Sequence, residues 1–188
     1  MSLDFHKVLQ NSYATKDKQK NAFVKEGFEY DSNLSNDNEQ VYYNPKSRKL
    51  VMSVAGTHNL KDIGTDLYLA AGHLKDTDRF KEAKSVLDRA KQKYNVSNAS
   101  LAGHSLGGLV QYLGSKNDKV YTYNKGATLG QSTNENAYRT SGDLVSIFNS
   151  QSKKMTTLRN PHIKTGNFVI DAFNAHSVDN IKNSQIKI

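Results

Sequence analysis

The chain has 188 residues, a formal net charge of +8, a hydrophobic content of 36% and no cysteine. This length suffices for one domain with a buried core, so we expect residues 1–188 to form a single domain. The lack of cysteine excludes disulfides, a thiol nucleophile and cysteine metal sites, and it permits but does not demonstrate a reducing compartment.

The apolar runs are too short for a transmembrane helix, and the first residues contain an early acid and no apolar core. We therefore expect neither a membrane span nor a signal peptide, which slightly favours an intracellular location. The positive charge fits an anionic membrane surface as a partner, or a lysine-rich solvated surface with no partner. No basic cluster is interleaved with aromatic residues, which argues against nucleic acid as a partner. The sequence does not predict the oligomeric state.

The first third of the chain predicts a helix followed by a hairpin. A rough helical stripe of apolar residues lies within residues 2–14. Residues 16–20 are predicted to be a polar break, and residues 31–38 a surface loop. Two strands are expected at 39–43 and 50–55, joined by a polar loop that Asn-Pro begins. The second strand is the more apolar, so we expect it to lie deeper in the sheet.

A long amphipathic helix is predicted from apolar residues at three- and four-residue spacing: Phe80, Ala83, Leu87, Ala90 and Tyr94. It leads directly into an apolar run at 99–102. Strand, helix and strand in this order form a βαβ unit, which predicts a parallel sheet. Further strands are expected at 120–123, 137–140 and 155–158, and a late helix at 168–175.

A Gly-x-Ser-x-Gly match at 103–107 lies between the apolar run and the predicted helix at 109–113. Strand, tight turn and helix are the context in which this motif forms a nucleophile elbow. The strained serine backbone requires that positions 103 and 107 lack side chains. We expect the hydroxyl of Ser105 to be exposed above the strand ends, near a helix N-terminus that favours negative charge. The alternative is a chance match.

A serine nucleophile needs a base, and histidine is the usual one because its pKa lies near neutrality. Two histidines follow the possible acids, and we favour His176, because a preceding apolar segment could hold it over the sheet. His162 follows Pro161 in a polar stretch and fits a solvated loop. The other histidines fit surface or packing roles, with His58 near the rim of the site: His6, His58, His73 and His104.

A carboxylate must orient the histidine, and in α/β-hydrolases it lies between the serine and the histidine in the chain. Asp143 follows a predicted strand, which places it at the catalytic edge of the sheet. It could instead cap a helix at 144–146. Asp118 lies in a polar turn and fits a solvated charge, and Asp171 lies inside the late helix.

The tetrahedral intermediate needs two N–H donors. One is the backbone N–H of Leu106, directly after the nucleophile. The other is expected at Gly56-Thr57, after a strand that neighbours the elbow, and the Thr57 hydroxyl could add a third donor. The alternative for these two residues is a simple strand-end turn.

Together these motifs resemble the class 3 lipases, the α/β-hydrolases that include the fungal triacylglycerol lipases. The resemblance covers roughly residues 28–180 and rests on four segments in the family's order: Val54–Thr57, Gly103–Gly108, Gly142–Ser146 and His176–Ser177. It implies a compact α/β-hydrolase fold, with a mostly parallel central sheet flanked by helices. It also implies Ser105 as nucleophile, Asp143 as acid, His176 as base, and Thr57 with Leu106 as oxyanion hole.

The resemblance further implies hydrolysis of a carboxylic ester, a lipid or a small ester, through an acyl-enzyme and without metal or cofactor. The chain departs from the family in being short, in lacking disulfide cysteines, and in having Ala55 where an arginine often precedes Gly-Thr. The interval between Thr57 and Asp76 leaves room for little or no lid. A peptidase, thioesterase or acyltransferase on the same fold stays open. So does a non-catalytic basic protein that binds a membrane or a partner.

Overall fold

The computed structural model describes residues 2–57, 76–126, 134–143, 146, 155–159, 161, 165–182 and 184–188. The described residues form one seven-stranded sheet whose strands lie side by side in chain order. The strands are β1 (Glu29–Tyr30), β2 (Glu39–Asn44), β3 (Lys49–Val54), β4 (Ser100–His104), β5 (Lys119–Tyr123), β6 (Glu135–Thr140) and β7 (Met155–Leu158). The first three strands pair antiparallel, and β3 to β7 pair parallel. The expected α/β fold with a mostly parallel sheet is therefore confirmed.

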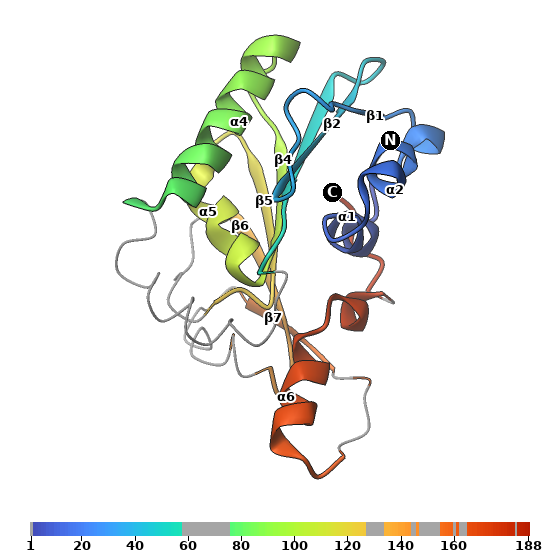
Figure 1. Cartoon of the computed structure of the whole chain (residues 1–188), viewed down its shortest axis with the longest axis vertical. Helices are drawn as coiled ribbons and strands as arrows, with labels where there is room; N and C mark the ends of the chain where they lie inside the picture. The colour runs from blue at the N-terminus through green and yellow to red at the C-terminus, as the bar shows by residue number, and fades with distance from the viewer. Residues whose placement is uncertain are drawn as a thin grey trace.

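Helices lie on both faces of this sheet (Figure 1). The α-helices are α1 (Phe5–Asn11), α2 (Lys16–Asn21), α4 (Asp78–Tyr94), α5 (Val110–Leu113) and α6 (Phe168–His176). Short 3-10 turns are η1 (Val24–Glu26), η4 (Ser105–Leu109) and η7 (Val178–Ile181). In Figure 1, α4 and α5 cover one face of the sheet and α1 and α2 cover the other, while α6 projects beyond the ends of the parallel strands.

The long helix α4 joins β3 to β4, as the βαβ prediction requires. The Thr77 hydroxyl caps its start by accepting from the N–H of Phe80 at 3.2 Å. Asn95, in the left-handed conformation with φ of 47°, ends it. The stripe of Ala83, Leu87 and their neighbours is fully buried against the sheet, so the apolar spacing in the sequence fixes which face packs.

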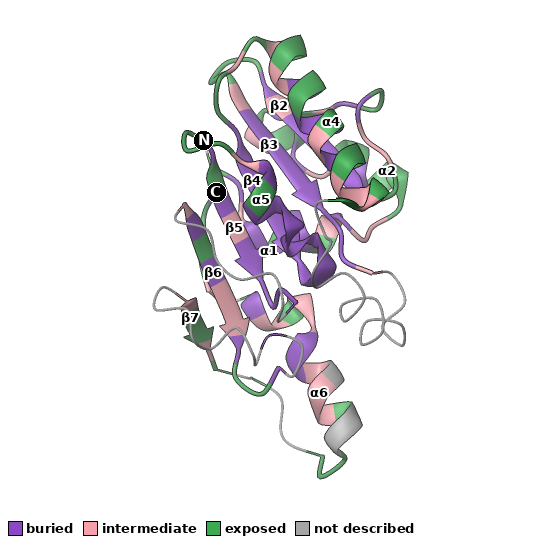
Figure 2. Cartoon of the chain, turned by 90° about the vertical axis from the view of Figure 1, so that its left-hand side faces the viewer, coloured by how far each residue is buried: buried purple, intermediate pink, exposed green. Residues whose placement is uncertain are grey.

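Two apolar layers sandwich the central strands. On β3, Leu50, Met52 and Val54 join the layer under α4, while Val51 joins the layer under α1. This alternation is the period of a strand that is buried on both faces. Figure 2 shows β3 and β4 buried along their lengths, whereas β6 and β7 become progressively more exposed. The more apolar strand of the hairpin is thus the more central one, as predicted.

The prediction of a polar break at 16–20 is wrong, because these residues lie in α2. The helix has no apolar stripe, and a side-chain amide takes its place. Gln19 is buried, and its amide donates to the carbonyl oxygens of Asn11 at 3.3 Å and Ala14 at 3.1 Å. A polar segment can therefore pack against the fold as a helix when the one amide side chain that it buries keeps its hydrogen bonds.

The prediction that Asp118 is a solvated charge is also wrong. Its side chain is fully buried and accepts from the N–H groups of Ala99 at 2.7 Å and Ser115 at 2.6 Å. Lys91 of α4 completes the cluster at 2.7 Å. Asp118 thus fixes the turn that enters β5, at the end of the sheet opposite the elbow.

The two ends of the chain are paired. Leu3 and Ile188 exchange two backbone hydrogen bonds of 2.9 Å, and Asp4 forms an ion pair with Lys187 at 3.0 Å. In the part of the chain that the structure describes, no helix combines the length and apolarity needed to cross a membrane.

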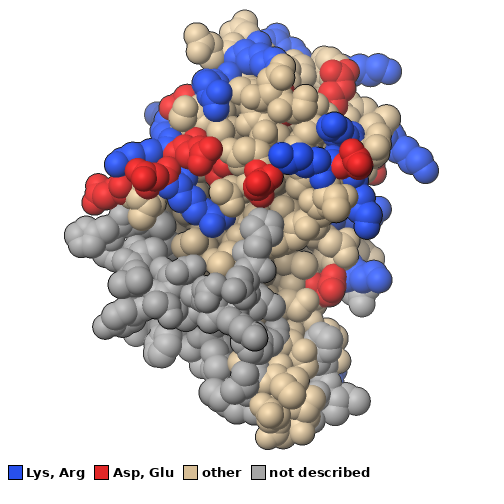
Figure 3. Space-filling model, in the orientation of Figure 1, with Lys and Arg blue, Asp and Glu red and all other residues tan. Residues whose placement is uncertain are grey.

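On the face in Figure 3, charged side chains gather over the part of the molecule that contains the sheet and the helices packed on it, and few lie in the described region around α6.

Candidate active site

The elbow has the strained geometry that the motif predicts. Ser105 lies between β4 and η4 with φ of 56°, a left-handed conformation that a residue with a side chain adopts at a cost of about 1–2 kcal/mol. A Cβ on Gly103 would lie 1.9 Å from the carbonyl oxygen of Gly107, and one on Gly107 would lie 2.1 Å from that of Val54. Both glycines are therefore required by close backbone contact.

Ser105 is buried, with 1% of its surface exposed, which contradicts the expectation of an exposed hydroxyl. The reason lies partly in the end of β3, because a Cβ on Gly56 would come within 2.8 Å of the Cβ of Ser105. The Ser105 hydroxyl oxygen has no hydrogen-bond partner among the described residues. The predicted nucleophile is thus a buried hydroxyl that lies close to Gly56 in the predicted oxyanion segment.

Asp143 and His176 meet, although 33 residues separate them. The Nδ1 atom of His176, at the end of α6, lies 2.9 Å from Oδ1 of Asp143, which follows β6. Oδ2 of Asp143 accepts from the N–H of Ser146 at 3.1 Å, so this carboxylate both caps a turn and contacts the histidine. A carboxylate at Nδ1 holds the proton there and leaves Nε2 as an acceptor in the neutral ring.

The hydrogen bond between Ser105 and His176 is not formed in this structure. His176 Nε2 is buried and, like the Ser105 hydroxyl, has no hydrogen-bond partner among the described residues. The two residues are nevertheless neighbours through His104, which precedes Ser105 and whose ring centroid lies 4.8 Å from that of His176. In enzymes without substrate this bond is often long and tightens only when substrate binds.

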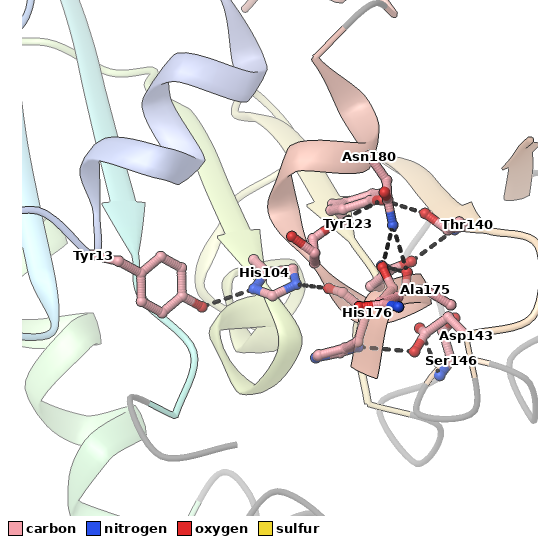
Figure 4. Close-up of polar contacts among 12 residues, drawn as sticks. Tyr13, His104, Tyr123, Thr140, Asp143, Ser146, Ala175, His176 and Asn180 are labelled. Carbon is pink, nitrogen blue, oxygen red and sulfur yellow. Dashed lines mark hydrogen bonds and ion pairs between the residues drawn. The ribbon is translucent and has the colours of Figure 1, made fainter. Parts of the chain in front are cut away.

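Asparagine side chains hold the backbone that leads into His176 (Figure 4). The Asn124 amide donates to the carbonyl oxygen of Ala175 at 3.0 Å and accepts from the N–H of Thr140 at 2.7 Å. The Asn180 amide donates to Asn174 at 2.7 Å and to Ala175 at 3.1 Å. The sequence predictions missed both residues. Position 124, directly after a predicted strand, offered the only signal, since asparagine tolerates the left-handed φ of 45° found there.

Two side chains hold the backbone of Ala55 and Gly56, the residues that follow β3 and precede the predicted oxyanion residue Thr57. Arg79 of α4 donates to the carbonyl oxygen of Ala55 and, at 3.4 Å, to that of Gly56. The N–H of Gly56 donates to the Tyr13 hydroxyl at 2.7 Å, so it is not available to a substrate. The Thr57 hydroxyl is buried without a partner among the described residues. Arg79 thus binds the backbone carbonyls of the two residues that precede Thr57.

The remaining predicted residues divide into three groups. His58, His73, His162 and the interval between Thr57 and Asp76, where little or no lid was expected, lie outside the described residues. Asp171 lies in α6 and accepts from the backbone N–H and the hydroxyl of Thr165 at 2.8 and 2.9 Å, away from His176. Leu106 is the first residue after Ser105, in η4. The described residues contain no cluster of three or more potential metal ligands.

No protein-family model matches the chain, and no curated protein matches its sequence. Solved structures are similar to it at low identity. The Rhizomucor miehei lipase in complex with its propeptide is 16% identical with a TM-score of 0.49, over 76% of this chain and 60% of that one. A lipase from Yarrowia lipolytica is 15% identical with a TM-score of 0.44, over 71% of this chain and 66% of that one. The chain thus spans about three-fifths of the length of the first of these structures and about two-thirds of the second.

Proposed function

We propose that this protein is a serine hydrolase that cleaves carboxylic esters, of lipids or of small molecules, through an acyl-enzyme on Ser105. The observation that carries the proposal is the buried pair of Asp143 and His176, 2.9 Å apart, beside a serine with φ of 56°. The carboxylate–imidazole pair and the strained serine could each have a purely structural role. A serine with a structural role alone, however, would not need an imidazole oriented by a carboxylate next to it.

In the proposed acylation step, His176 Nε2 takes the proton of the Ser105 hydroxyl as its oxygen attacks the ester carbonyl carbon. As the new C–O bond forms, the electron pair of the carbonyl π bond moves onto its oxygen. The N–H groups of Leu106 and Thr57 and the Thr57 hydroxyl stabilise the resulting oxyanion by hydrogen bonds. Collapse of the intermediate breaks the bond to the alcohol, which leaves with the proton from His176. Asp143 stabilises the imidazolium in between.

Deacylation repeats the sequence with water. His176 removes a proton from a water molecule that attacks the acyl carbonyl, and returns the proton to Ser105 as the acid departs. Every proton goes through Nε2 of His176, which has no hydrogen-bond partner among the described residues. This scheme uses side chains and backbone alone.

A lipid-like acyl group is the favoured substrate class. The supports are the four motifs shared with class 3 lipases, the fold similarity to two fungal lipases, and the apolar composition of α6, which carries the proposed base at its end. Ile170 of this helix is 47% exposed, which leaves apolar surface accessible on the helix that carries the proposed base.

The test is hydrolysis of p-nitrophenyl esters of increasing acyl length by the wild type, Ser105→Ala and Ser100→Ala. Ser100 is a buried serine of the same strand and lies at its opposite end, so it controls for a general effect of the substitution. We expect Ser105→Ala to lower kcat by about 10³-fold or more and Ser100→Ala to leave it within about twofold. Folded wild type that turns over no ester, or equal rates for wild type and Ser105→Ala, would contradict the proposal and favour a non-catalytic binding protein.

A further inference from the structure

A chain of hydrogen bonds unites three backbone segments of the candidate site, and Figure 4 shows its part from Tyr13 through His104 to the backbone of His176. The N–H of Gly56, at the end of β3, donates to the Tyr13 hydroxyl at 2.7 Å. That hydroxyl lies 2.8 Å from Nδ1 of His104, the last residue of β4. Nε2 of His104 lies 2.8 Å from the carbonyl oxygen of His176. We call Tyr13 and His104, with these contacts, the relay.

The partners fix the direction of every bond in the relay. A carbonyl oxygen only accepts, so Nε2 of His104 must carry its proton and donate to His176. A neutral imidazole then accepts at Nδ1, and the Tyr13 hydroxyl, already accepting from Gly56, donates its own proton there. All donors and acceptors are matched, which makes a buried polar chain rigid rather than costly.

His104 must stay uncharged for this arrangement to hold. Burial and the neighbouring His176 hold the pKa of His104 well below its usual range. The pKa of Tyr13 is raised by burial to about 12, although the Gly56 N–H and Arg79 oppose the shift. Both residues therefore remain neutral at physiological pH, and a cation beside His176 is avoided.

The N-terminal segment that supplies Tyr13 is anchored to the segment that follows the proposed base. Tyr13 comes two residues after α1, whose Phe5 N–H donates to Ile186 at 3.0 Å. His6 of the same helix contacts Asp179 of η7 at 3.4 Å. The helix thus touches both the elbow, through Tyr13, and the backbone beyond His176.

We propose that Tyr13 and His104 are positioning residues that set the spacing between the oxyanion strand and the proposed base, His176. This inference rests on the proposed function. Gly56 lies close both to Tyr13 and to Ser105. A Cβ placed on it would come within 2.5 Å of the Tyr13 hydroxyl and 2.8 Å of the Ser105 Cβ. A shift at either bond therefore changes where the oxyanion donors and the imidazole stand relative to Ser105.

The first test compares Tyr13→Phe with Tyr42→Phe. Tyr42 is a buried tyrosine of the apolar layer under α1, with a hydroxyl hydrogen-bonded to Asn11, so its substitution controls for the loss of one tyrosine hydroxyl. We expect Tyr13→Phe to lower kcat by about 10- to 100-fold with KM within about twofold, because misplacement affects the transition state rather than binding. Tyr42→Phe should lose similar thermal stability and keep its kcat. A kcat for Tyr13→Phe within about twofold of the wild type, or equal losses in both variants, would overturn the proposal.

The second test separates the two halves of the relay. His104→Gln places its amide N–H near the position of Nε2 and retains the bond to His176 while losing that from Tyr13, whereas His104→Leu loses both. We expect kcat to fall in the order wild type, His104→Gln, His104→Leu, and equal kcat values in the two variants would contradict this.

A third measurement does not depend on turnover. Nitrogen-15 NMR of the histidine rings should find His104 neutral from pH 5 to 8, protonated at Nε2 and accepting at Nδ1. A protonated His104, or a proton on Nδ1, would overturn the relay even if the enzyme is active. A wild type that hydrolyses no ester but gives the expected NMR pattern would refute the proposed function and leave the hydrogen-bond chain standing.

Discussion

The two sides of the candidate site are built by different means. On the elbow side, the position of Ser105 follows from backbone exclusion, since Gly103 and Gly107 pack against carbonyl oxygens with no room for a methyl group. On the histidine side, directional hydrogen bonds from Asn124, Asn180 and Asp143 hold His176 and the residues before it. The elbow follows β4, a strand that is buried along its whole length (Figure 2), and the histidine side lies at the end of α6, the helix that projects beyond the parallel strands (Figure 1).

Because of this difference, we expect substitutions on the elbow side to lower the stability of the fold and substitutions on the histidine side to lower catalysis. Backbone exclusion is a packing effect, so a single added atom is expected to disturb the whole fold. A hydrogen-bonded segment loses one contact at a time, so substitutions there should change catalysis in steps while the fold persists. Four predictions test this contrast.

The largest effect is expected for Asp143→Asn on the histidine side. The amide keeps the size of the side chain and can still accept from the N–H of Ser146, but it no longer supports the proton on Nδ1 of His176. We expect kcat for an ester to fall by about 10⁴-fold, with little change in melting temperature. Asp171→Asn, a change in a carboxylate of α6 away from the site, is the control and should keep kcat. A drop in stability that matches the drop in rate would break the contrast.

On the elbow side, Gly107→Ala should act on the fold. The new Cβ would clash with the carbonyl oxygen of Val54, and we expect a loss of about 3 kcal/mol or more in the free energy of unfolding. Gly142→Ala is the matched control, because Gly142 has φ of 86° and no atom within 4 Å of an added Cβ. That variant should lose only about 1 kcal/mol, the cost of the left-handed conformation. Urea unfolding measures both, and equal losses would show that exclusion is not what shapes the elbow.

A smaller effect is expected for Asn124→Gly. Glycine keeps the left-handed backbone, so the change removes only the amide that joins Thr140 to Ala175. We expect kcat to fall by about 10-fold, and the free energy of unfolding by about 1–2 kcal/mol. Asn95→Gly, at the left-handed end of α4, is the control and should leave kcat unchanged. If both variants have the wild-type kcat, Asn124 does not hold the histidine segment.

The smallest effect, and one of opposite sign, is expected for Glu39→Gln. Glu39 pairs with Val54 at the elbow side, is buried, and has no hydrogen-bond partner for either carboxyl oxygen among the described residues. Burial raises the pKa of Glu39, the nearby carboxylate of Glu82 adds to this, and the charge of Arg79 only partly opposes it. The folded state therefore binds this proton more tightly than the unfolded chain does, and its contribution to stability is present below the unfolded pKa of about 4.3 and is lost as pH rises through the folded pKa.

Glutamine mimics the protonated acid at every pH. We therefore expect Glu39→Gln to melt at a higher temperature than the wild type at pH 8, with the two curves converging at pH 3. Melting curves across this range measure the difference. A variant that is less stable than the wild type at pH 8, or a gap that is the same at both pH values, would contradict a charge penalty on the elbow side.

The sequence predicted the features that depend on local patterns, and these lie mainly on the elbow side. The apolar run of β3 and the apolar stripe of α4 are local patterns, and both predicted the structure closely. The elbow is also local, since Gly-x-Ser-x-Gly in its strand and helix context states its own backbone geometry. The proximity of Asp143 and His176 was predicted from chain order, from the position of Asp143 after a strand and from the apolar segment before His176, and the structure places the two side chains in contact.

The relay and the asparagine contacts could not be predicted, because they join residues that have no pattern in common. Tyr13 and His104 are 91 residues apart, and nothing around Tyr13 distinguishes it from any apolar-face tyrosine. The predictions for Gln19 and Asp118 were wrong for a related reason. Polar residues in polar stretches were expected at the surface, yet each is buried and hydrogen-bonded. Only the three-dimensional fold shows which polar groups have partners.

The central claim is that Ser105 is an activated nucleophile. The most direct measurement is labelling of the folded protein by a fluorophosphonate, with the modified peptide identified by mass, in the wild type, Ser105→Ala and Ser100→Ala. We predict a single adduct on Ser105 that is lost in Ser105→Ala and retained in Ser100→Ala. Folded wild type that takes up no label, or label that persists in Ser105→Ala, would contradict the account.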